Sequence, residues 1–118
     1  MTHQRMELIF KESGRSARIA TRFHKNILRV ELTPSALTFY PTLLGVKTTE
    51  LLALPIEDIQ SVKRVNERGI PSFEVNAQGQ AKFCWFDTTV PDEWESAFSS
   101  VGIVVEREPD AEKVATDV

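Results

Sequence analysis

Alternating apolar and polar residues mark the first two predicted strands. The segments ARIATRF and LRVEL, separated by HKNI, each place an apolar or small residue at every second position. A two-residue period is typical of a strand with one face buried, and HKNI is short enough for a hairpin connection. If Phe23 is paired with Leu28, the apolar side chains of both strands lie on one face of the hairpin. The same register sets Arg22 directly against Arg29.

The segment TPSA predicts a second hairpin. Proline suits the second position of a type I turn because its ring holds φ at about −65°, and LTFYP then returns as the next strand. The predicted cross-strand pairs are Leu32 with Leu37, Val30 with Phe39, and Arg29 with Tyr40.

The segment LALPIEDIQSVKRV has apolar residues at every third position, which fits either a short amphipathic helix or two strands joined at a corner. Pro55 cannot lie in the interior of a helix, because it lacks an N–H and its ring clashes with the preceding turn. We therefore predict a strand, a one-turn corner over 55–59, and a second strand over 60–66. Ile56 and Ile59 would fill the core at that corner.

A third hairpin is predicted around Asn76 to Gly79, which fits a type I turn with a bulge. Pairing Asn76 with Gln80 sets Glu74 opposite Lys82. One face then carries Phe73, Val75, Ala81, Phe83 and Trp85. Cys84 and Phe86 point to the other face, away from the core.

The last predicted element is an amphipathic helix. In TTVPDEWESAFSSVG, Thr89 is a candidate cap and Pro91 suits the first turn. The apolar stripe is Trp94, Ala97, Phe98 and Val101. Gly102 suits the end of the helix, which would close one end of a curved sheet.

Composition and charge indicate how the chain is divided into segments. The 118 residues suit one domain, with 42% hydrophobic and 26% charged residues. The net charge of −3 resides in the tail, where five acids face two bases. We expect an N-terminal arm over 1–15, a domain over 16–105 and a flexible acidic tail over 106–118. No segment reads as a signal peptide or membrane span, and the single cysteine cannot form an internal disulfide, so we expect a cytoplasmic protein.

The segments VELTPSALTFYP, LALPIEDIQSVKRV and VPDEWESAF resemble the pleckstrin-homology-like (PH-like) superfamily, most closely its GRAM-like and bacterial PH-like branches. The resemblance covers roughly Ser16 to Val105. It implies a mainly β, α+β fold: about seven antiparallel strands in a partly open barrel, capped by one C-terminal helix. Such folds bind lipid head groups, peptides or protein surfaces, so the resemblance implies a non-catalytic binding or adaptor module.

Basic residues supply the candidates for an anion or lipid site. Arg18, Arg22, Lys25 and Arg29 stand in the region where PH domains that bind phosphoinositides place their cations. Arg22 facing Arg29 would be destabilising unless an anion lay between them. The alternative is a solvated basic face partly balanced by Glu31. An anionic membrane surface is therefore one candidate partner.

Apolar residues outside the predicted core supply the candidates for a protein interface or self-association. They are Leu43, Leu44, Cys84, Phe86 and Ile103. The strand ending at Phe86 is also expected near a sheet edge, where an unpaired ladder invites a second chain. The alternative is that 103–105 folds back over Cys84 and Phe86 within one chain.

Enzyme chemistry has little support in the sequence. His3 and His24 are the two histidines, and no group of residues has metal-ligand spacing. The pair Glu57 and Asp58 suits a corner better than an acid–base dyad. We expect no catalytic residue, no metal and no cofactor. A pI near 5.4 also argues against nucleic acid as a partner.

Overall fold

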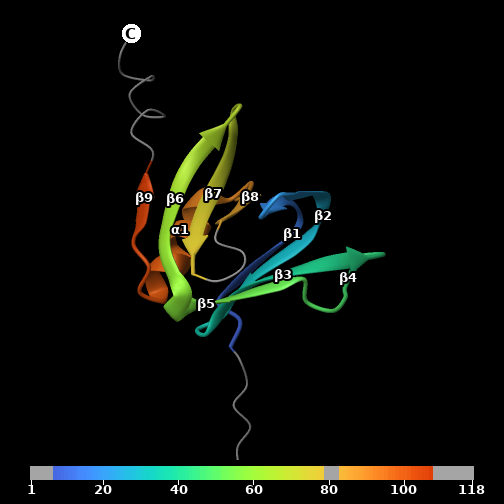
Figure 1. Cartoon of the computed structure of the whole chain (residues 1–118), viewed down its shortest axis with the longest axis horizontal. Coiled ribbons are helices and arrows are strands. Elements are labelled where there is room, and N and C mark those ends of the chain that lie inside the picture. The colour runs from blue at the N-terminus through green and yellow to red at the C-terminus, as the bar shows by residue number, and fades with distance from the viewer. Residues whose placement is uncertain (1–6, 79–82, 108–118) are drawn as a thin grey trace, which may run out of the picture.

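In the computed structural model of the protein, residues 7–78 and 83–107 are described, and they form one bent sheet with a helix packed against it (Figure 1). The elements are β1 Phe10–Ile19, β2 Arg22–Leu32, β3 Ala36–Leu43, β4 Val46–Lys47, β5 Leu52–Pro55, η1 Ile56–Asp58, β6 Ile59–Glu67, β7 Ile70–Ala77, β8 Phe83–Asp87, α1 Pro91–Ser100 and β9 Val105–Arg107.

The strands follow the order β4-β3-β2-β1-β8-β7-β6-β9, and β5 pairs with β3. Their pairings are antiparallel except that of β6 with β9, which is parallel. β1 joins the two halves of the sheet, because its residues Ala17–Ile19 pair with β8. β8 therefore lies between β1 and β7, so the prediction that it lies near a sheet edge is wrong.

Two predicted connections are confirmed. The β2–β3 register pairs Leu32 with Leu37 and Val30 with Phe39. The turn between these strands is closed by Thr33, whose Oγ1 accepts from the Ala36 N–H at 3.1 Å. The corner is confirmed as well: β5 ends at Pro55, η1 follows, and β6 begins directly after it.

The predicted β1–β2 register is wrong. The chain reverses at Ala20 and Thr21, so Phe23 lies opposite Arg18 rather than Leu28. The turn lies before Arg22 instead of at HKNI, so Arg22–Leu32 is one continuous strand. Leu28, Val30 and Leu32 are buried as predicted, and alternation along the strand puts Phe23 on the opposite face, where 52% of it is exposed. One register shift of the β1–β2 pair lies beside Asn26, which has a φ of 57° and whose N–H donates to Ser16 Oγ at 2.9 Å.

This register also corrects two further expectations. Arg22 lies opposite Ile19 and Arg29 opposite Tyr40, so the two arginines do not face each other across a ladder. β1 begins at Phe10, inside the range 1–15 that the sequence analysis assigns to an arm. Inward-facing and outward-facing residues do not alternate regularly over 10–15, because Gly14, with a φ of 72°, lies where the β1–β2 register shifts.

The predicted β7–β8 register is also wrong. Asn76 pairs with Phe83, and Glu74 with Trp85. The expected partners Gln80 and Lys82 lie outside the described residues. Because the difference in register is an odd number of residues, every side chain of β8 changes face. Cys84 and Phe86 are fully buried, whereas Phe83 and Trp85 lie on the other face of the sheet.

The core is sealed by α1, whose buried residues Trp94, Ala97 and Phe98 follow the predicted stripe. The residue preceding the helix is Val90, without a side-chain cap, so Thr89 is not the cap. At the other end the Gly102 and Ile103 N–H groups donate to the carbonyls of Ser99 and Phe98, both at 3.0 Å. These two bonds form a Schellman motif, which Gly102 permits because it adopts a φ of 88°.

Candidate binding surfaces

The four basic candidates divide into two groups. Arg18, Arg22 and Lys25 are exposed near the β1–β2 turn and make no ion pair with the described residues. Arg18 also lies over the Phe23 ring, 5.8 Å from its centroid. Arg29 is different, because its Nε lies 3.0 Å from Glu31 Oε2.

Glu31 has a second cation partner. Lys47 Nζ lies 3.1 Å from each of its carboxylate oxygens and 4.3 Å from the centroid of the Tyr40 ring. Only 7% of the Glu31 side chain is exposed, so this carboxylate compensates Arg29 and Lys47 in a partly desolvated setting. One carboxylate balances one of these two cations, so this cluster keeps a net positive charge, and Arg18, Arg22 and Lys25 are the candidates without an ion pair among the described residues.

The most prominent apolar surface is the tip of the β3–β4 hairpin, which projects from the rest of the fold (Figure 1). We call Leu43, Leu44 and Val46 the apolar tip; they are 67%, 95% and 66% exposed. Leu44 and Gly45 turn the chain with φ values of 54° and 81°. Positive φ at a leucine is disfavoured, because its Cβ crowds the backbone, and such positions concentrate at functional sites.

The structure removes Cys84 and Phe86 from the exposed candidates. Both are fully buried, and burial raises the pKa of the Cys84 thiol to about 11. A thiol with so high a pKa is a poor nucleophile at neutral pH. Ile103 is partly buried against the core, and Val105 pairs with Val62 of β6, which leaves Val104 83% exposed.

A cleft that the sequence analysis missed lies between the β1–β2 and β6–β7 hairpins. It has a volume of about 400 Å³ and is lined by Arg18, Phe23, Glu67, Arg68, Glu74, Phe83 and Trp85. Three of these side chains are aromatic. The alternation of Phe83 with Trp85 was the available signal, but the predicted register turned both residues into the core.

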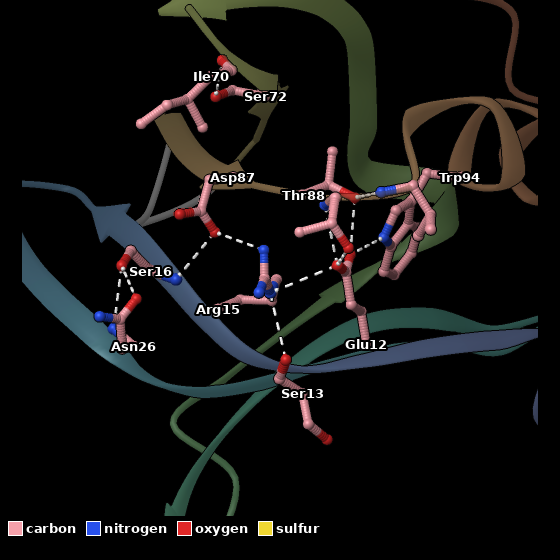
Figure 2. A network of polar contacts seen from close by, with 12 residues as sticks. Glu12, Ser13, Arg15, Ser16, Asn26, Ile70, Ser72, Asp87, Thr88 and Trp94 are labelled. Atoms are coloured by element: carbon pink, nitrogen blue, oxygen red, sulfur yellow. Dashed lines mark hydrogen bonds and ion pairs between the residues drawn. The ribbon is translucent and has the colours of Figure 1, made fainter.

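The densest polar network surrounds Glu12 on β1 (Figure 2). Oε1 accepts from Thr88 Oγ1 at 2.7 Å and from Trp94 Nε1 at 2.8 Å. Oε2 accepts from the Thr89 N–H at 3.0 Å and its Oγ1 at 2.9 Å, and lies 3.4 Å from Arg15 Nε. Each oxygen is fully engaged, so this carboxylate ties β1 to the start of α1.

The same network sets the pKa of Glu12. Burial by itself raises the pKa, but the hydrogen bonds from Thr88, Thr89 and Trp94 outweigh burial and hold the pKa below its ordinary value. A carboxyl that keeps its charge in this way is a poor proton donor. Sequence reasoning missed Glu12 because it falls in the range assigned to the arm.

The described residues contain no group of three or more His, Cys, Asp and Glu side chains that could hold a metal ion. Glu57 and Asp58 lie in η1, at the predicted corner. In the part of the chain that the structure describes, no helix is both long and apolar enough to cross a membrane.

The sequence matches no protein-family model and no curated protein. Among solved structures, the chain is similar to the Vps36 N-terminal PH domain, with a TM-score of 0.61 and 12% identity. That match covers 86% of this chain and 85% of the other. The fold is PH-like. A PH-like fold accounts for the bent sheet and the closing helix α1, and at this level of identity the likeness concerns architecture alone.

Proposed function

We propose that this protein is a non-catalytic PH-like binding or adaptor module that acts through protein–protein contact, and that it self-associates through the apolar tip. The observation that carries the proposal is Leu44, which is 95% exposed at the end of a projecting hairpin. Contiguous exposed apolar side chains usually mark an interaction surface. Burying one leucine contributes roughly 1.5–3 kcal/mol, so three such residues can supply much of a weak interface.

Light scattering and analytical ultracentrifugation test self-association. We expect a concentration-dependent assembly from the wild type and a monomer from Leu44→Asn, since asparagine keeps the left-handed turn and removes the apolar group. Leu44→Met is the matched control and should still assemble. A wild type that stays strictly monomeric at high concentration, or a Leu44→Asn protein that assembles like the wild type, would contradict this proposal.

A second candidate function is peripheral binding to an anionic membrane surface. It is favoured by Arg18, Arg22 and Lys25, which are exposed without an ion pair among the described residues. Antiparallel pairing of β2 with β3 brings the β1–β2 and β3–β4 turns to the same end of the sheet. Cations beside an apolar group provide the two signals that stable membrane attachment needs.

Vesicle sedimentation tests this second function. At low salt we expect more wild-type protein on anionic than on neutral vesicles, and loss of that difference when Arg22 and Lys25 are both changed to Gln. Equal sedimentation with both vesicle types would contradict lipid binding.

We further infer that the protein is cytoplasmic. We also infer that it belongs to the GRAM-like, bacterial PH-like branch, which the segments VELTPSALTFYP, LALPIEDIQSVKRV and VPDEWESAF support.

A further inference from the structure

An open hollow lies between the start of β1 and the helix α1, and it has a volume of about 420 Å³. Ile9, Phe10 and Ala97, which are partly or fully buried, supply its apolar floor. Phe10 is held there by an edge-to-face contact with Trp94, at 4.8 Å between ring centroids. The exposed residues of the rim are polar: Asp92, Glu93, Ser96 and Ser100.

We propose that this hollow receives the apolar tip of a second copy of the chain, so that copies assemble head to tail. The inference rests on the proposed self-association and names the surface that the tip binds. A cavity of about 150 Å³ accommodates benzene. The hollow therefore has room for the side chain of Leu44, the most exposed residue of the tip, and for part of its neighbours.

The tip and the hollow lie far apart on one molecule. Figure 1 shows the β3–β4 hairpin projecting on one side of the domain and α1 on the opposite side. The tip of a chain therefore lies away from its own hollow, and the contact joins two different patches of two copies. Such a heterologous contact leaves one tip and one hollow free in every pair, so assembly continues to a ring or a filament.

The surroundings of the tip are positively charged. Lys47 follows the tip on β4 and is 41% exposed. It shares the carboxylate of Glu31 with Arg29, so this cluster has one excess positive charge. Glu50, the next acid along the chain, lies farther from the turn, because the backbone of Leu51 has already returned to β3.

The rim of the hollow is negatively charged. Asp92 is bound by Arg64 at 2.8 Å, whereas Glu93 makes no ion pair with the described residues. Lys11 directly follows Phe10, so the alternation of β1 directs it to the other face of the sheet. Docking the tip in the hollow thus brings Lys47 of one copy toward Glu93 of the next, and charge complementarity favours this orientation.

A complementation experiment with full-length variants tests the proposal. Leu44→Asn removes the tip and keeps the hollow, whereas Ser96→Arg fills the hollow with a long side chain and keeps the tip. In analytical ultracentrifugation we expect the wild type to grow beyond a dimer and each variant alone to be monomeric. An equal mixture of the variants should form a one-to-one dimer and stop there, because it has one intact tip and one intact hollow. A mixture that stays monomeric would overturn the proposal.

Ser99→Arg is the matched control, since Ser99 is exposed on the same helix but does not line the hollow. We expect Ser96→Arg to weaken self-association by about tenfold or more, and Ser99→Arg to assemble like the wild type. Equal weakening by both substitutions would overturn the assignment to the hollow. Dimer formation in the mixture would also show that Leu44→Asn and Ser96→Arg are folded.

The charge of the rim has its own test. Glu93→Gln should weaken assembly severalfold and reduce its dependence on salt, whereas Glu57→Gln on η1 should leave both unchanged. An unchanged salt dependence in Glu93→Gln would overturn this docked arrangement.

Two further outcomes separate this inference from the proposed function. A wild type that stays monomeric would overturn both. A wild type that assembles through Leu44, together with a Ser96→Arg protein that assembles equally well, would overturn the hollow alone and indicate contact between two tips.

Discussion

At the scale of single residues, Glu12 shows how one buried charge can hold distant segments together. Its side chain is 10% exposed, which would favour the neutral form if burial acted alone. Donors from Thr88, Thr89 and Trp94 reverse that preference. Since these donors belong to the β8–α1 connection and the first turn of α1, the charge of Glu12 stabilises the packing of α1 against β1.

This arrangement predicts a pH-dependent stability. A folded pKa below the unfolded one means that Glu12 contributes stability above its unfolded pKa, about 4.3. The contribution is lost as pH falls through the lower folded pKa. Glu12→Gln should lower the free energy of unfolding by about 2–3 kcal/mol at pH 7. The difference from the wild type should shrink in acid, as measured by urea denaturation across pH. A difference that is constant from neutral to acidic pH would contradict this.

Leu44 gives a second prediction at this scale, because its left-handed backbone conflicts with its side chain. Relief of this conflict by Leu44→Asn should raise the free energy of unfolding by about 1 kcal/mol. A higher urea midpoint with an unchanged slope would show it. Loss of assembly together with a gain of stability would mark Leu44 as a residue retained for contact. A lower midpoint would contradict the strain argument.

At the scale of elements, the position of β8 determines which surfaces are available for self-association. It lies between β1 and β7, so both of its edges are hydrogen-bonded and its Cys84 side faces the core. An interface built on Cys84 and Phe86 would require this central strand to leave the sheet. Self-association therefore has to use other surfaces, of which the apolar tip is the most exposed.

The position of β8 predicts the reactivity of Cys84. Burial and a thiol pKa raised to about 11 leave little accessible thiolate at pH 8. We expect iodoacetamide to alkylate the native protein far more slowly than the urea-unfolded protein, with mass spectrometry as the readout. Labelling of the native protein at the unfolded rate would show that β8 is exposed after all.

At the scale of the whole molecule, Phe86 connects both halves of the sheet to the helix. Its ring centroid lies 5.9 Å from Phe39 of β3, 5.6 Å from Phe73 of β7 and 5.1 Å from Trp94 of α1. Aromatic pairs at such distances contribute beyond the area that they bury. The residue expected from the sequence to form an interface is instead at the centre of the fold.

Phe86→Ala should therefore lower the free energy of unfolding by about 3–5 kcal/mol, because a fully buried aromatic ring leaves a cavity. Phe83→Ala is the matched control on the same strand and should cost far less, since Phe83 lies on the cleft face. Thermal and urea denaturation of both variants would measure the difference. Equal costs would contradict the observed register of β8.

Elements whose structure depends on neighbouring residues could be predicted from the sequence. The turn at Thr33 to Ala36 set the β2–β3 register, and Pro55 required the corner before β6. The apolar period of 94–98 placed the buried face of α1. In each case a local steric or hydrogen-bonding constraint admits few alternatives, so the pattern alone was sufficient.

Long-range strand pairing sets the position of the β1–β2 turn and the buried face of β8, and with them the candidate sites. Period-two alternation is satisfied equally well with either face of β8 buried, and the pairing of β8 with β1 and β7 selects between the two. The aromatic cleft depends on this choice, because Phe23, Trp85 and Glu74 come from strands far apart in sequence. Their proximity follows from long-range strand pairing and shared burial, which no local pattern encodes.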